Sequence, residues 1–268
     1  MSGHSGDRLA AMFATCRDEN RAALIGYLPT GFPDVPASIA AMTALIESGC
    51  DLVEVGVPYS DPGMDGPTVA RAGEVALQGG VRVRDTLTVV EAISKAGGRA
   101  VVMTYWNLVL RYGVDAFARD LASAGGLGLI TPDLITDEAD DWMAASEQHR
   151  LDRIFLVAPS STPQRLAETS HASSGFVYAA STMGVTGARD TVSSAAPELV
   201  RRVREVSDIP VGVGLGVRSG AQAAEIGAYA DGVIVGSALI SALTESVAAL
   251  RVLTEELASG VRQRDSQR

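Results

Sequence analysis

Residues 51–67 read DLVEVGVPYSDPGMDGP, a short apolar run that leads into a loop rich in proline and glycine. Because successive side chains point to opposite faces of a strand, the valines of this run share one face, and Glu54 lies on the other face between Leu52 and Gly56. The valine face suits packing against helices. The stretch therefore reads as one parallel strand of an α/β fold, with its polar residue turned toward the inside.

Seven other β-branched or apolar runs occur along the chain, and a helical pattern follows each of them. No two runs are joined by a two-residue hairpin turn, which favours parallel pairing. Eight such units in 268 residues predict an α/β protein with a (β/α)8 TIM barrel, and a doubly wound open sheet is the alternative. The predicted strands are Ala23–Leu28, Leu52–Val57, Ala100–Thr104, Gly126–Thr131, Arg153–Val157, Gly175–Ala179, Pro210–Gly214 and Gly232–Val235.

An extra helix is expected before the first strand, because Leu9, Met12, Phe13 and Cys16 recur at helical spacing within 7–20. It could close the bottom of the barrel. We expect a single domain over residues 1–268, with residues 1–6 and 260–268 frayed.

The composition narrows the class of protein. The net charge of −10 argues against a nucleic-acid binder, which usually carries a basic face. No apolar run reaches the roughly 18 residues that a membrane span needs, and the first residues carry no apolar signal stretch, so a cytoplasmic location is expected. The two cysteines, Cys16 and Cys50, are expected to be buried thiols.

Two carboxylates stand out as candidates for chemistry. A glutamate inside a barrel is costly unless it is paired or used, and Glu54 lies near the C-terminal end of its strand, where barrel enzymes hold their active sites. A structural glutamate bonded to a neighbouring strand is the alternative. Asp65 could reach back over the barrel mouth toward Glu54, whereas Asp61 before Pro62 suits turn capping. Two carboxylates in different environments favour acid–base chemistry.

Glycine-rich segments follow the last three predicted strands. They are MGVTG at 183–187, the alternating glycines of 210–217 that end at Gly216, and Gly236–Ser237 at a predicted helix start. Bare backbone and a helix N-terminus suit an anionic phosphate. Tight turns alone are the alternative.

Lysine and histidine chemistry is not expected. The single lysine, Lys95, ends a helix that leads into the third predicted strand, so it lies toward the N-terminal face. None of His4, His149 and His171 ends a strand, and no two are spaced as metal ligands. The sequence thus offers no lysine for a Schiff base and no metal site, which leaves general acid–base catalysis by carboxylates.

Five segments together resemble the tryptophan synthase α chain family, in order and spacing, from about residue 22 to 250. They are EVGVPYSDPGMDGP at 54–67, TYWNLV at 104–109, GLITPDL at 128–134, GVTG at 184–187 and GSALI at 236–240. The first is highly specific, and the glycine motifs are less so.

The resemblance implies a lyase that splits indole-3-glycerol phosphate into indole and D-glyceraldehyde 3-phosphate in L-tryptophan biosynthesis. It implies a partner β chain that carries pyridoxal phosphate and receives indole in an α2β2 complex, and no cofactor on this chain. The alternatives are a free-standing indole-3-glycerol phosphate lyase and a non-catalytic partner of a β chain. Indole-3-glycerol phosphate synthase, a related barrel, should need an active-site lysine that this chain does not offer.

The resemblance also implies individual roles. Glu54 would transfer protons at indole carbon 3 and at the glycerol hydroxyl, Asp65 would stabilise positive charge on the ring nitrogen, and Tyr178 would be the active-site tyrosine. Asp61 and Pro62 would face the β chain. The implied substrate-binding residues are Tyr27, Met103, Tyr105, Thr186, Gly187, Gly216, Gly236 and Ser237. The chain departs from the family at Gly63–Met64, Ala70 and Thr182, positions that concern loop mobility and subunit contact more than chemistry.

Overall fold

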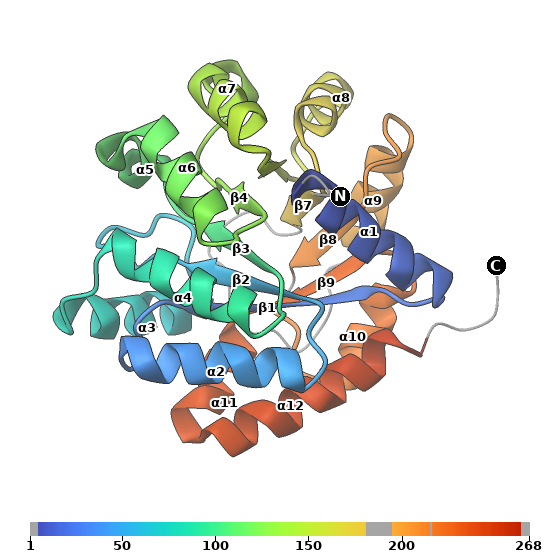
Figure 1. Cartoon of the computed structure of the whole chain (residues 1–268). Helices are drawn as coiled ribbons and strands as arrows, with labels where there is room; N and C mark the ends of the chain where they lie inside the picture. Colours follow the sequence, from blue (N-terminus) through green and yellow to red (C-terminus); the bar gives the residue numbers. More distant parts are fainter. Residues whose placement is uncertain (1–4, 181–194, 215, 264–268) are drawn as a thin grey trace.

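The computed structural model describes residues 5–180, 195–214 and 216–263, so Thr182, Thr186 and Gly187 lie outside the described residues. Within these ranges the chain forms a single sheet of parallel strands that alternate with helices (Figure 1). The strands are β1 (Ala23–Pro29), β2 (Leu52–Gly56), β3 (Ala100–Met103), β4 (Gly128–Ile130), β5 (Asp152–Ile154), β6 (Leu156–Val157), β7 (Val177–Ala180), β8 (Val211–Gly214) and β9 (Gly232–Val235).

The sheet closes on itself at the fifth predicted strand. That strand divides into β5 and β6, which are separated only by Phe155; β5 pairs with β4, and β6 pairs with β7. The Tyr178 amide donates to the Phe155 carbonyl at 3.0 Å across the junction. With the order β5-β4-β3-β2-β1-β9-β8-β7-β6, the two ends of the sheet thus belong to one continuous segment. The predicted TIM barrel is confirmed, and the open sheet is excluded.

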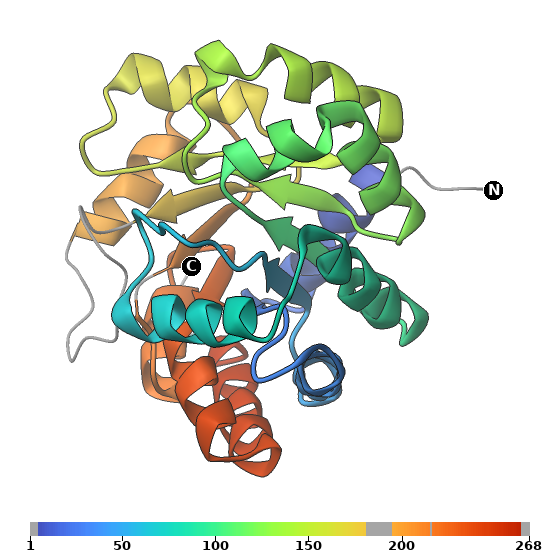
Figure 2. The same cartoon turned by 90° about the vertical axis from the view of Figure 1, so that its left-hand side faces the viewer.

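Helices surround the strands in both views (Figures 1 and 2). They are α1 (Ser5–Asp18), α2 (Val35–Glu47), α3 (Pro67–Gln78), α4 (Val83–Lys95), α5 (Trp106–Tyr112), α6 (Val114–Ser123), η1 (Thr136–Glu138), α7 (Asp140–His149), α8 (Pro163–Ala172), α9 (Ala195–Arg204), α10 (Gly220–Gly227), α11 (Ser237–Glu245) and α12 (Val247–Val261). None of these described helices is long and apolar enough to cross a membrane.

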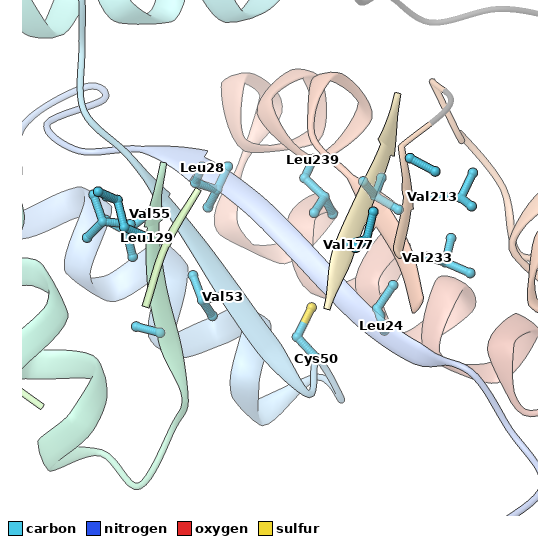
Figure 3. Packing of buried hydrophobic residues seen from close by; sticks show 14 of the residues in the cluster. Leu24, Leu28, Cys50, Val53, Val55, Leu129, Val177, Val213, Val233 and Leu239 are labelled. Atoms are coloured by element: carbon cyan, nitrogen blue, oxygen red, sulfur yellow. The ribbon is translucent and has the colours of Figure 1, made fainter. Parts of the chain in front are cut away.

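The larger part of the core lies between the strands and the surrounding helices. Figure 3 shows part of it, with Val53 and Val55 of β2 among the labelled side chains, together with Leu24, Val177 and Val213. All five are fully buried. The valine face of the 51–67 segment thus packs outward, as its alternation predicted.

A second, smaller apolar cluster fills the inside of the barrel. Leu9 and Phe13 of α1 pack there with the inward-facing Ile25 and Leu52, and the rings of Phe13 and Phe176 lie 5.6 Å apart. The extra N-terminal helix therefore closes the N-terminal end of the barrel, as expected. The C-terminal ends of the strands are left for a functional site.

The described part of the chain begins and ends close to a helix. Ser5 and Gly6 belong to α1, and α12 continues through Val261. A Cβ at Gly260 would collide with the Gly220 backbone, so the two helices pack closely at this point. Fraying of residues 1–6 and 260–268 stays a prediction, and residues 1–4 and 264–268 lie outside the described residues.

Candidate active site

Glu54 lies inside the barrel on β2 and is 1% exposed. Neither of its carboxylate oxygens has a hydrogen-bond partner among the residues that the structure describes. Burial, reinforced by the charge of Asp65, raises the pKa of Glu54 to about 8. The alternative of a glutamate bonded to a neighbouring strand finds no support in this part of the chain. A carboxyl group held in this way can both accept and release a proton near neutral pH.

Two tyrosines flank this carboxylate. Tyr27 of β1 is the register partner of Glu54, and its ring occupies the space where Gly56 has no side chain. Tyr178 of β7 lies in the same manner against Gly214 of β8. Burial and the negative charges of Glu54 and Asp65 raise the pKa of both tyrosines, which keeps their hydroxyls protonated. Both hydroxyls can therefore donate hydrogen bonds beside Glu54.

The glycines of β8 serve a different purpose from the one their pattern suggested. The inward positions of Gly212 and Gly214 receive the rings of Phe176, which precedes β7, and of Tyr178 in β7. Aromatic rings therefore cover the space that side chains at these two positions would take. Gly216 lies beyond the strand, with a positive φ of 64° that favours glycine.

Asp65 lies on the loop between β2 and α3, within hydrogen-bonding reach of the Tyr105 side chain. Burial raises the pKa of Asp65, and a hydrogen bond from the Tyr105 side chain opposes that rise. Tyr105 follows β3 and is 9% exposed. Met103, the last residue of β3, packs against the interior cluster. The structure thus brings Glu54 and Asp65 to the same end of the barrel, near enough for the charge of Asp65 to raise the pKa of Glu54.

Gly236 and Ser237, two of the predicted phosphate residues, lie at the same end of the barrel. Gly236 is the N-cap of α11, which begins at Ser237, directly after β9. The first amides of a helix have no partner within it, and the helix dipole adds positive potential there. Tyr27 lies beside Gly236, because a Cβ at that glycine would be 3.2 Å from its ring. Backbone donors and the two candidate carboxylates therefore share the barrel mouth.

The predicted partner residues lie on the outside of the β2–α3 loop. Asp61 is exposed and accepts a hydrogen bond from the Ser60 hydroxyl at 2.6 Å. Pro62 lines a cavity of about 470 Å³ between this loop and α3. The other residues that line this cavity are Tyr59, Ser60, Pro67, Ala70, Arg71, Glu74 and Leu77.

Lys95, His149 and His171 lie away from this site, and His4 lies outside the described residues. Lys95 ends α4, is largely exposed and pairs with Glu91 at 2.7 Å. His149 of α7 pairs with Asp115 at 2.8 Å, and His171 lies on α8. No group of three histidine, cysteine or acidic residues in the described ranges could hold a metal ion. The two cysteines are free and buried, as expected.

Sequence and structure comparisons agree on one family. A model of the family described as "Tryptophan synthase alpha chain" matches residues 13–267. The chain belongs to the tryptophan synthase alpha chain family. The protein of that name from Mycobacterium tuberculosis is 81% identical over 255 residues, which cover 95% of this chain and 94% of the relative.

Solved structures support the same assignment. A structure of Mycobacterium tuberculosis tryptophan synthase matches with a TM-score of 0.93 and 80% identity, covering 95% of this chain and 98% of that one. The tryptophan synthase complex from Pyrococcus furiosus matches with a TM-score of 0.82 and 30% identity, covering 88% and 98%. As a tryptophan synthase alpha chain, the protein is a lyase of tryptophan biosynthesis that cleaves indole-3-glycerol phosphate.

Two residues near this site, Tyr59 and Asn107, were not identified from the sequence. Tyr59 and Asn107 each follow a predicted strand and carry polar groups, but nothing in the sequence shows that they touch. In the structure the Asn107 amide donates to the Tyr59 hydroxyl at 3.0 Å. The departures at Gly63–Met64 and Ala70 lie on the same loop and on α3, outside the barrel.

Proposed function

We propose that Glu54 and Asp65 perform the cleavage of indole-3-glycerol phosphate as a retro-aldol reaction driven by acid–base catalysis. The observation that carries this proposal is the isolated position of Glu54, which is buried at the barrel mouth with a pKa raised to about 8. A carboxyl group with that pKa is a suitable proton donor and acceptor at neutral pH. Lys95 is the last residue of α4, the helix that precedes β3, so it lies at the opposite end of the barrel from Glu54. A Schiff base is therefore not part of the proposal.

The proposed reaction uses the indole ring as the electron sink. Protonated Glu54 donates its proton to indole carbon 3, which gives an indolenine with positive charge toward the ring nitrogen. Asp65 stabilises that charge. Removal of the proton from the adjacent glycerol hydroxyl then breaks the carbon–carbon bond, returns the electron pair to the ring and releases indole and D-glyceraldehyde 3-phosphate. We assign this second proton transfer to Glu54 as well.

The remaining residues are proposed to hold the substrate. Tyr178 lies beside Glu54, where its protonated hydroxyl can hydrogen-bond the reacting groups. Tyr27, Met103 and Tyr105 come from neighbouring strands and would line the indole pocket. The phosphate would be bound by backbone amides at Gly216, Gly236 and Ser237, together with Thr186 and Gly187, which lie outside the described residues.

We further propose that the chain acts with a β chain in an α2β2 complex in the cytoplasm. The support is the relative from Pyrococcus furiosus, whose structure is that of a tryptophan synthase complex. The exposed Asp61 and the neighbouring Pro62 lie on the outer side of the loop that carries Asp65, which suits a partner surface. Pyridoxal phosphate would belong to the β chain, and this chain would need no cofactor of its own.

An indole-release assay tests the proposal. The purified chain, alone and with saturating β chain, is given indole-3-glycerol phosphate, and indole is measured. Glu54→Gln should stay folded and bind substrate, yet lose nearly all turnover, since one acid–base group contributes roughly 10²–10⁴-fold. Turnover of Glu54→Gln within tenfold of the parent would overturn the assignment. If the parent forms no indole in either condition, a non-catalytic partner role becomes the better description.

A further inference from the structure

Tyr105 contacts the loop of Asp65 at two separate points. Its ring stacks on Tyr59, with centroids 4.7 Å apart and an interplanar angle of 29°. Its hydroxyl accepts a hydrogen bond from the Met64 amide at 3.0 Å. One contact is near the start of the loop that follows β2, and the other is immediately before Asp65. Tyr105 therefore spans most of this loop from the end of β3.

Tyr105 is itself held in place by its neighbours. The Asn107 side chain donates to the Tyr59 hydroxyl at 3.0 Å, so the stacked pair is tied to the start of α5. The Trp106 amide, the first of α5, donates to Asp133 Oδ1 at 2.9 Å, which fixes that helix end to the loop after β4. Three neighbouring loops thus meet around one buried tyrosine.

We propose that Tyr105 is a positioning residue for Asp65, and that Tyr59 and Asn107 act through it. This inference rests on the proposed function, because Asp65 matters only if it serves the reaction. The loop has Gly63 and Gly66 on either side of the Met64–Asp65 pair, and glycine adopts a wider range of backbone angles than other residues. The Tyr105 ring and hydroxyl restrain this segment through their contacts with Tyr59 and Met64, and they turn the Asp65 carboxylate toward the barrel mouth.

The hydroxyl can serve both partners at once. A tyrosine hydroxyl has one proton to donate and lone pairs to accept, so it can accept from the Met64 amide while it donates to the Asp65 carboxylate. A bond donated to a carboxylate favours its ionised form, which is the form that can stabilise positive charge on the indole nitrogen. Loss of the hydroxyl should therefore both loosen Asp65 and raise its pKa.

The test compares Tyr105→Phe with Tyr112→Phe. Tyr105→Phe keeps the stacked ring and removes only the hydroxyl. Tyr112 is a matched control because it also donates to an aspartate, Asp120, at 2.8 Å, but on the outer helices. For Tyr105→Phe, kcat should fall about tenfold, the loss expected for one charge-assisted hydrogen bond, with KM within about twofold. The acid limb of the kcat profile should move up by roughly one pH unit. Tyr112→Phe should have the same kcat, the same KM and the same acid limb as the parent.

A second measurement does not need turnover. Carbon-13 labelling of aspartate carboxyl groups, with Asp65→Asn to identify the resonance, gives the pKa of Asp65 directly. Tyr105→Phe should raise that pKa by roughly one unit, and Tyr112→Phe should leave it unchanged. An unchanged Asp65 pKa together with an effect on KM alone would overturn the proposal and leave Tyr105 as a lining residue of the pocket. If the parent makes no indole, the proposed function fails, whereas the carboxyl titration still decides whether Tyr105 governs Asp65.

Discussion

Gly214 of β8 lies against the ring of Tyr178 of β7, so that a Cβ at position 214 would be 2.5 Å from the tyrosine hydroxyl and 3.0 Å from two ring carbons. The missing side chain is what allows Tyr178 to turn into the barrel beside Glu54. Gly56 and Tyr27 repeat this relationship on the other side of the site. The orientation of both tyrosines thus depends on a glycine in the next strand.

Gly214→Ala should lower turnover while leaving the chain folded. The added methyl group forces the Tyr178 ring to shift, at a stability cost of about 1–3 kcal/mol, and a displacement of about 1 Å in an active site can cost about 10²-fold in rate. Steady-state kinetics and thermal unfolding measure the two effects. Gly73→Ala is the control, because a Cβ there meets nothing within 4 Å and the site is helical. It should keep full turnover and gain up to about 1 kcal/mol. Equal turnover in both variants would show that Tyr178 tolerates displacement.

The pH dependence of stability should reveal the buried carboxyl group of Glu54. Its pKa is raised from 4.5 to about 8 in the folded chain, so the folded state holds this proton over a range where the unfolded state has lost it. Stability should therefore fall as pH rises from about 4.5 to 8, by at most about 5 kcal/mol from this group. The side chain introduced by Glu54→Gln cannot ionise, so this variant should not show that fall of stability with rising pH.

Urea unfolding at several pH values measures this difference. Above pH 8 the free energy of unfolding of Glu54→Gln should exceed that of the parent, and below pH 4.5 the two should converge. Asp152→Asn is unsuitable as a control, because Asp152 lies in the packed base of the barrel. Asp61→Asn is a suitable control, because Asp61 is exposed on the loop that follows β2. Parallel profiles for the parent and Glu54→Gln would contradict the raised pKa.

The barrel and its faces could be predicted because they depend on local periodicity. The alternation in 51–67 placed the valines outside and Glu54 inside, and the helical spacing of Leu9 and Phe13 predicted a helix that closes the barrel. Division of the fifth strand around Phe155 could not be predicted, since it reflects pairing with two different neighbours.

The roles of the β8 glycines and of Tyr105 could not be predicted for a related reason. That Gly212 and Gly214 receive rings depends on the register with β7, in which Tyr178 pairs with Gly212. The stack of Tyr59 on Tyr105 joins loops that are distant in sequence. Such contacts arise only when the closed barrel brings the strands and loops together, so the residue pattern of a single strand cannot predict them.

Gly216→Val should weaken binding of the substrate phosphate. The valine would adopt a φ of 64° only with strain, and its side chain would occupy space near the proposed phosphate amides. Gly97→Val is the control, because Gly97 also has a positive φ, of 81°, but lies between α4 and β3 at the opposite end of the barrel. Calorimetric titration with glycerol 3-phosphate should show weaker binding, by tenfold or more, for Gly216→Val alone. Equal affinities would place the phosphate elsewhere.

Activity should survive a chelator, and borohydride should trap no adduct with substrate. The reasons are the ion-paired, exposed position of Lys95 and the separation of His149 and His171 on different outer helices. Indole formation is measured after dialysis against EDTA, and intact mass is measured after treatment with borohydride and substrate. Loss of activity that a divalent ion restores, or a mass increase that disappears in Lys95→Ala, would contradict catalysis by carboxylates alone.

Addition of β chain should raise the rate of indole formation at least tenfold. Indole is small, neutral and membrane-permeable, so a chain that released it freely would lose its product. The loop that carries Asp65 has glycines around the carboxylate and presents Asp61 and Pro62 on its outer side. A partner that binds this outer side in one loop conformation favours that conformation by its differential affinity, and a tenfold stimulation requires only about 1.4 kcal/mol of such preference. Asp61→Ala and Pro62→Ala should therefore reduce the stimulation more than the basal rate, as measured by titration of each variant with β chain. If the chain alone turns over as fast as it does with saturating β chain, it is a free-standing lyase, and the loop is already in its active conformation without a partner.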